Sequence, residues 1–179
     1  FLARNILHIE LNNEKLRKPS PPGKGVMLQP DGSNLPWVIA GLQEASQSAY
    51  KDWIAHLQTA LPDLTGIRVV ERPEDRHRYL MAGFRNGLEV PSWMLSDGTL
   101  HLLALTVVPY LPEFDSVCLV EEPENSIHPL NIETVMQSLS SVYDGQVLVA
   151  THSPAILAMT DAGKVLVFSR DESRGTSII

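Results

Sequence analysis

The sequence predicts an α/β fold, in which a largely parallel core sheet with flanking helices follows a small helical and antiparallel segment. Three observations lead to this prediction. Unbroken apolar runs at 117–120, 147–150 and 165–168 are typical of strands that are covered on both faces of a parallel sheet. Apolar residues at helical spacing over 132–143 separate the first two runs, which makes a strand–helix–strand unit. The length of 179 residues suits one domain with a sizeable buried core.

The first sixty or so residues predict a strand, a loop and a helical region, in that order. Residues 5–11 alternate weakly between apolar and polar types, as a strand does, and residues 18–33 are rich in the loop formers Pro, Gly and Ser. Asn34 is suited to cap the helix that follows it. Apolar residues then recur at helical spacing over 37–61, and the polar patch at 43–48 can divide this stretch into two helices.

The middle of the chain predicts antiparallel strands and then a buried helix. Residues 67–70 and 79–84 are strand-like runs that a charged turn joins, and an Asn-Gly turn leads to a third short strand at 88–90. Residues 100–108 are apolar almost all round, so we expect a buried helix rather than an amphipathic one. The chain therefore divides into a connecting helical and antiparallel lobe at 1–94 and a part with the core strands at 95–179.

Composition and charge weigh against some classes of function. The net charge of −7, with scattered basic residues, argues weakly against a surface that binds duplex DNA. No apolar run approaches the ~18 residues that a membrane span needs. Cys118 is the only cysteine, so no internal disulfide can form. We expect a cytoplasmic protein that has no membrane partner.

Acidic and imidazole side chains follow two strands of the predicted parallel sheet. The first core strand runs directly into Glu121 and Glu122, and the second runs into Thr151 and His152. Because the carboxyl ends of parallel strands meet at one edge of the sheet, where ligands bind, topology brings these side chains near each other. Adjacent glutamates are most often a solvated turn, but a buried strand that ends in both is unfavourable without a cation or polar partner. Neighbouring side chains leave a strand on opposite sides, so one can hold a hydrated metal while the other activates a water.

A second candidate site is the turn before the buried helix. Ser96 is suited to cap that helix, and Gly98 allows the backbone to come close to a ligand. A helix N-terminus with free N–H groups and a serine hydroxyl attracts anions. The same turn also fits a well-capped core helix that binds nothing.

Four segments, in order, resemble the motifs of ABC-type ATPases. Residues 95–99, Leu-Ser-Asp-Gly-Thr, resemble the signature motif, and residues 117–124, Val-Cys-Leu-Val-Glu-Glu-Pro-Glu, resemble a Walker B strand. Residues 125–129 resemble the D-loop, and residues 147–154 resemble the strand that carries the switch histidine. Each motif alone is weak, but four in the family order at compatible spacing are specific, and together they cover 95–169.

The resemblance implies the head of a P-loop NTPase that binds and hydrolyses ATP with Mg²⁺. It implies that Glu122 is the general base that activates the attacking water, and that His152 senses or stabilises the γ-phosphate. Glu121 stands where the family usually has the Walker B aspartate, which holds Mg²⁺ through water. The longer side chain of Glu121 is a departure from the family pattern.

The resemblance also implies self-association of two heads around nucleotide. Ser96, Asp97 and Gly98 belong to the signature motif and would contact the ATP that the opposite subunit holds. Asn125 and Ser126 belong to the D-loop and would lie in the interface between the two sites.

The sequence contains no Gly-x-x-x-x-Gly-Lys-Ser/Thr motif, the Walker A loop that cradles phosphates. We therefore expect this chain to be the C-terminal half of a head and to be inactive alone. The residues before the signature show no heptads, unlike SMC-type proteins, and the loop at 31–36 resembles one in the RecF-like, AAA-21 branch. This branch includes the overcoming-lysogenization-defect (OLD) ATPases, which implies an effector protein or domain as a partner.

Three functions remain open. The leading one is an ATP-hydrolysing head that dimerises around nucleotide and controls an effector in anti-phage defence or DNA repair. The alternative is a nucleotide-sensing scaffold with little or no hydrolysis that holds a partner protein, which the departure at Glu121 favours. Binding of nucleic acid is a third, which the acidic charge of this half does not support.

Overall fold

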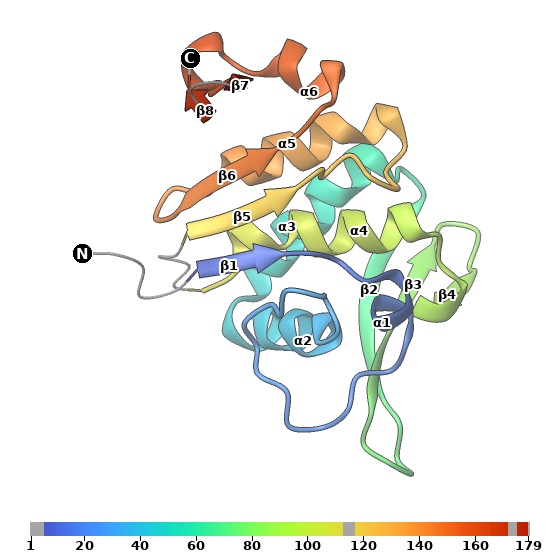
Figure 1. The fold of residues 1–179 in the computed structure, drawn as a ribbon. Helices are drawn as coiled ribbons and strands as arrows, with labels where there is room; N and C mark the ends of the chain where they lie inside the picture. Colours follow the sequence, from blue (N-terminus) through green and yellow to red (C-terminus); the bar gives the residue numbers. More distant parts are fainter. Residues whose placement is uncertain (1–5, 113–116, 172–174, 179) are drawn as a thin grey trace.

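The core of the computed structural model is a parallel sheet of three strands, which lie side by side in Figure 1. The structure describes residues 6–112, 117–171 and 175–178. The strands β1 (Ile6–Ile9), β5 (Val117–Glu121) and β6 (Gln146–Ala150) lie in the order β1-β5-β6, and both pairs are parallel. These pairings confirm the predicted α/β fold and the first predicted strand.

The faces of the sheet are covered unevenly. Cys118 and Val120 of the central strand β5 are buried. β6 instead alternates between exposed and half-buried residues, and Leu148 is exposed. The prediction that 147–150 is covered on both faces was therefore wrong, because the face of β6 that carries Leu148 is left exposed. β6 is also an edge strand of the described sheet.

Three helices precede the antiparallel strands: α1 (Asn13–Arg17), α2 (Leu35–Ala45) and α3 (Gln47–Ala60). Ser46 separates α2 from α3 and caps α3 by accepting a hydrogen bond from the N–H of Ala49 at 3.1 Å. The polar patch therefore divides the helical stretch as predicted. Asn34 precedes α2, but its side chain makes no cap. Its amide donates to the carbonyl oxygens of Gly25 and Met27 instead, which braces the preceding loop.

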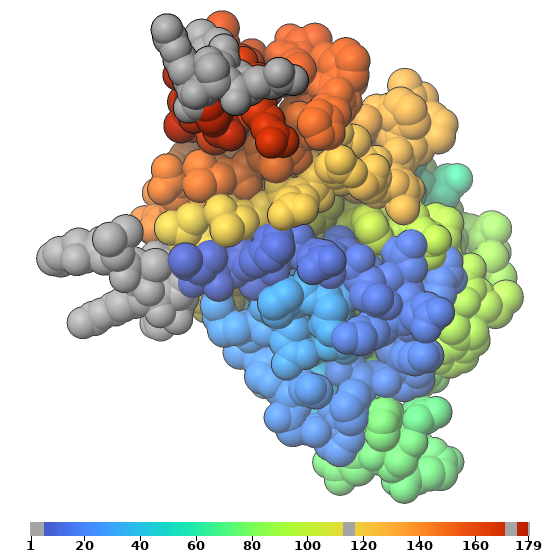
Figure 2. Space-filling model, in the orientation of Figure 1, coloured from blue at the N-terminus to red at the C-terminus, as the bar shows by residue number. Residues whose placement is uncertain are grey.

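A second sheet is antiparallel, as the sequence predicts. Its strands are β2 (Leu64–Glu71), β3 (Arg78–Phe84) and β4 (Glu89–Pro91), paired in chain order. The tip between β2 and β3 projects from the lower edge of the molecule in the view of Figure 2. The short 3-10 helix η1 (Ser92–Met94) then leads from this sheet to the next helix.

The helices α4 (Asp97–Thr106) and α5 (Ile132–Ser140) pack with α3 in the core. Every residue of α4 from Leu100 to Thr106 is buried, which confirms the predicted buried helix. Thr106 joins three helices: its hydroxyl accepts from Trp53 Nε1 at 3.0 Å, and its carbonyl oxygen accepts from the Ser138 hydroxyl at 2.9 Å. α5 ends before Tyr143, which is 90% exposed, so the helical pattern extended too far.

The C-terminal elements differ from the prediction. They follow β6 as α6 (Pro154–Met159), η4 (Ala162–Lys164), β7 (Phe168–Asp171) and β8 (Gly175–Ile178). β7 pairs antiparallel with β8, and residues 165–167 form no strand. The prediction of a third parallel strand at 165–168 was therefore wrong, since an apolar run alone does not specify its partner and a hairpin is the nearest one.

One hydrophobic core joins these elements, from Ile9 in β1 to Ile156 in α6. It contains residues on both sides of residue 94, and β1 belongs to the sheet of the second part. The division into 1–94 and 95–179 stays a prediction. Two further 3-10 helices, η2 (Val108–Tyr110) and η3 (Pro129–Asn131), flank the β5 region. In the described ranges, no helix is long and apolar enough to span a membrane.

Candidate functional site

The turns after β5 and β6 lie side by side at one edge of the parallel sheet. Glu121 is in register with Ala150, and the N–H of Glu122 donates to the carbonyl oxygen of Ala150 at 2.7 Å. Because β6 continues directly into the turn that carries His152, this edge gathers the predicted carboxylates and the predicted histidine on neighbouring turns. The structure therefore places the turns that carry these residues side by side, and their role in a site stays a prediction.

Glu121 contacts a histidine that the sequence reasoning missed. Nε2 of His8 lies 3.2 Å from Oε1 of Glu121, and the side chains are 43% and 68% exposed. His8 on β1 is in register with Leu119, two residues before Glu121, so alternation along the strands brings the two side chains to the same face. The sequence does show a histidine near the end of a predicted strand. It does not show that this strand pairs with β5.

Glu122 adopts a backbone conformation that is unfavourable for residues with a β-carbon. Its φ is 44°, in the left-handed region. Its carboxylate oxygen Oε2 accepts a hydrogen bond from Nδ2 of Asn125 at 2.6 Å, and its carbonyl oxygen accepts from the N–H of Asn125 at 2.9 Å. The two adjacent carboxylates therefore have different surroundings: Glu121 contacts β1, and Glu122 contacts the turn that follows it.

Glu124 links the turn after β5 to the turn after β6. The Thr151 hydroxyl donates to Oε1 of Glu124 at 2.5 Å and accepts from the N–H of Ser153 at 2.9 Å. His152, between these residues, is exposed. Oε2 of Glu124 is buried and has no hydrogen-bond partner among the described residues. The Thr151 hydroxyl therefore fixes the turn on both sides of His152. The sequence reasoning gave Glu124 no such role.

The turn before α4 has the predicted cap. The N–H of Thr99 donates to Oγ of Ser96 at 3.1 Å, and the two hydroxyl oxygens lie 2.8 Å apart. Gly98 was expected to let a ligand come close, but the group that lies close to it belongs to this chain. A β-carbon at Gly98 would collide with the carbonyl oxygen of Ser126. Ser126 itself has a φ of 66°. The backbone of Ser126 therefore lies directly against the first turn of α4.

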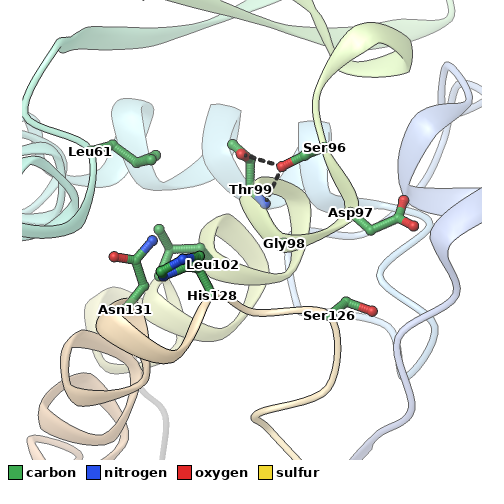
Figure 3. A pocket seen from close by; sticks show the side chains of 9 residues that line it. All are labelled: Leu61, Ser96, Asp97, Gly98, Thr99, Leu102, Ser126, His128 and Asn131. Carbon is green, nitrogen blue, oxygen red and sulfur yellow. Dashed lines mark hydrogen bonds between the residues drawn. The ribbon is translucent and has the colours of Figure 1, made fainter.

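A cavity of about 530 Å³ opens beside this turn (Figure 3). Its volume lies in the range of small-molecule sites. Figure 3 shows the Ser96 and Thr99 hydroxyls meeting over the first turn of α4, whereas the Asp97 carboxylate points away from them. The sequence reasoning assigned no role to His128, which lies within the segment 125–129, or to Asn131, which follows it. The lining residues are Leu61, Ser96, Asp97, Gly98, Thr99, Leu102, Ser126, His128 and Asn131.

The turn at 122–126 connects the two groups of candidate residues. At one end, Asn125 binds the carboxylate of Glu122. At the other end, Ser126 packs against Gly98. The structure therefore brings the end of β5, the turn at 122–126 and the first turn of α4 into one continuous region.

The chemistry of Glu121 fits a hydrated magnesium ion. No group of three or more His, Cys, Asp or Glu side chains in the described part of the chain could hold a metal ion by itself. Mg²⁺ does not need such a cage, because it usually keeps several waters and takes one or two carboxylates together with substrate phosphates. The exposed Glu121 carboxylate, beside His8, is suited to that kind of site.

Comparisons with known proteins agree with this arrangement. The model of the family AAA_21, described as "AAA domain, putative AbiEii toxin, Type IV TA system", matches residues 3–158. No curated protein matches the chain by sequence. The fold matches 30 solved chains. One, from work on ATP-driven dimerization and DNA stimulated activation of SMC ATPases, has a TM-score of 0.59 and 14% identity, over 79% of this chain and 88% of that chain.

The structural similarity supports an ATPase-type α/β fold, and the family match covers most of the sequence. The parallel sheet agrees with the structural neighbour, and the family match at residues 3–158 includes all four motif segments. The chain therefore belongs to the AAA_21 family of ATPase-type domains.

Proposed function

We propose that the chain is the part of an ATP-hydrolysing head that carries the general base, the magnesium-side carboxylate and the signature turn, and that two heads associate around ATP. The turn at 122–126 is the observation that carries this proposal. It holds Glu122 through Asn125 and contacts the signature turn through Ser126. A single short segment thus couples hydrolysis in one head to the surface that closes on the partner's nucleotide.

Glu122 is the general base of the proposed reaction. Backbone strain of the kind seen at Glu122 costs about 1–3 kcal/mol and clusters at active sites, where the surroundings hold it in place. The Asn125 amide engages one carboxylate oxygen of Glu122, which leaves the other free to take a proton from the attacking water.

Glu121 and His152 complete the catalytic edge. Glu121 would hold Mg²⁺ through water, and such an ion would supply neutralisation of charge on the phosphate oxygens. His152 contacts the γ-phosphate from the turn that Thr151 and Glu124 brace. Ser96, Asp97 and Gly98 serve the nucleotide of the opposite head, and Asn125 and Ser126 lie between the two sites.

The phosphate cradle comes from another segment of the protein, because the sequence contains no Walker A motif. The outer edge of β6 can accept a further strand. The 179 residues alone therefore do not hydrolyse ATP.

The head belongs to the RecF-like and OLD branch and controls an effector in the cytoplasm, in anti-phage defence or DNA repair. The toxin in the description of the AAA_21 family supports a link to an effector. The SMC work, which concerns ATP-driven dimerization, supports self-association.

The decisive experiment uses Glu122→Gln in the intact protein. The amide keeps the shape of the side chain but cannot take a proton, so we expect phosphate release to fall by about 100-fold or more while ATP-dependent association remains. Phosphate release and light scattering measure the two properties.

Glu133→Gln is the matched control, because Glu133 is exposed on α5 and contacts only the neighbouring Gln137 among the hydrogen-bond partners described. It should hydrolyse ATP like the wild type. Normal turnover by Glu122→Gln contradicts the assignment of the base. ATP-dependent association without turnover in the wild type favours the nucleotide-sensing scaffold instead.

A further inference from the structure

The short helix α1 contacts the start of α4 through two polar pairs. Arg17 pairs with Asp97, and one turn earlier Asn13 pairs with His101, whose Nε2 lies 2.5 Å from the Asn13 Oδ1. The spacing is four residues on each helix, so the two pairs lie side by side. Burial lowers the pKa of His101, although the Asp97 carboxylate and the backbone of Asn125 oppose that shift. The ring of His101 is therefore neutral near pH 7 and acts as a hydrogen-bonding group in this contact.

The Arg17 guanidinium spans three residues around the signature turn. Its Nε and Nη2 both donate to Oδ1 of Asp97, at 3.1 and 2.5 Å. Its Nη1 donates to the carbonyl oxygens of Leu95, at 2.6 Å, and Trp93, at 3.2 Å. The guanidinium thus binds the residue before Ser96 and the residue after it.

The other end of Arg17 is fixed as well. The hydroxyl of Ser92, which is 1% exposed, donates to the carbonyl oxygen of Arg17 at 3.2 Å. The segment from η1 to the first turn of α4 is therefore bound to α1 at both the main chain and the side chain of Arg17. The position of Ser96 depends on this attachment, because both of its neighbours are held by one side chain.

We propose that Arg17 is a positioning residue for the signature turn, which sets Ser96 at the angle needed to close on the nucleotide of a second head. This inference rests on the proposed function. Arg17 itself contacts no nucleotide in the proposal, since Asp97 and the two carbonyl oxygens occupy four of its hydrogen bonds. The role requires the planar fork of arginine, because the single ammonium group of lysine cannot reach the same acceptors in that geometry.

Arg17→Lys in the intact protein tests the proposal. We expect it to bind ATP as a monomer like the wild type, to weaken ATP-dependent association by about tenfold, and to recover most of its turnover at high protein concentration. Arg68→Lys is the matched control, because one guanidinium nitrogen of Arg68 donates to both carboxylate oxygens of Glu89 on the antiparallel sheet, away from the turn before α4. It should associate like the wild type. Thermal melting of each variant shows whether it is folded.

A double-mutant cycle separates positioning from general stability. Since Arg17 acts through Ser96, the Arg17→Lys and Ser96→Ala changes should be non-additive, so that Arg17→Lys costs little association once Ser96 is alanine. Additive effects, or normal association by Arg17→Lys, overturn this inference and leave the proposed function standing. A wild type that hydrolyses nothing and shows no ATP-dependent association overturns the proposed function, and this inference with it.

Discussion

Glu122 combines three features at one residue: a left-handed φ of 44°, an N–H bound to β6 and a carboxylate bound to Asn125. The N–H bond ends the strand pairing, and the positive φ turns the chain away from the sheet. The carboxylate therefore lies over the turn instead of continuing the alternation of β5. Strain at Glu122 is the cost of this placement.

Substitutions at Glu122 should reveal that strain. Glycine adopts positive φ readily, whereas alanine does not. Although both variants lose the carboxylate, the free energy of unfolding of Glu122→Gly should therefore be about 1 kcal/mol larger than that of Glu122→Ala. Urea denaturation of the protein measures this difference.

Gln137, which is exposed in the interior of α5, should show the opposite order, because glycine is about 1 kcal/mol worse than alanine inside a helix. If Glu122→Ala is at least as stable as Glu122→Gly, the backbone at this position is not strained.

At the scale of elements, the first turn of α4 fits closely against the turn at 122–126. Ser96 caps the helix with its hydroxyl, and Gly98 leaves room for the carbonyl oxygen of Ser126. Ser126 reaches that position with a φ of 66°. The contact therefore depends on two features: the space that Gly98 leaves on the helix, and the positive φ of Ser126 in the turn.

Gly98→Ala should push this turn away from α4. A methyl group meets backbone that cannot rotate aside, so we expect a loss of stability of about 1–3 kcal/mol and a loss of ATP-dependent association in the intact protein. Thermal melting and light scattering measure the two effects.

Gly25→Ala is the matched control, because an added β-carbon there has no atom within 4 Å and the backbone φ is not positive. Its stability should equal that of the wild type or exceed it slightly. A Gly98→Ala protein that melts and associates normally contradicts the steric contact.

At the scale of the whole molecule, the core depends on pairings between distant parts of the chain. β1 pairs with β5, and Cys118, the only cysteine, is buried in that central strand. Burial raises the pKa of its thiol to about 12. The thiol is therefore protonated at pH 8, and the thiolate that reacts with disulfide reagents is scarce.

Cys118 should report unfolding of the entire domain. We expect its labelling by a disulfide reagent at pH 8 to be slower than in urea by about 100-fold or more, and to appear at the same urea concentration as the loss of circular dichroism. A thiol that labels quickly in native protein would show that the sheet opens locally around β5.

Periodicity was sufficient for the elements whose pattern is local. The buried helix α4, the break between α2 and α3 and the strands of both sheets follow from side-chain types along the chain, because burial and capping act over a few residues. The run at 165–168 failed for the same reason: its sequence does not distinguish a parallel core strand from an exposed hairpin strand.

For the candidate site, the sequence determined which residue types follow β5 and β6, and parallel topology was enough to bring Glu122 and His152 to one edge. Only the tertiary structure decided that His8 meets Glu121, that Gly98 receives Ser126 and that Arg17 holds the signature turn. Each of these contacts joins segments far apart in the sequence or depends on a backbone angle. Their geometry arises from packing of the complete fold, which no local pattern encodes.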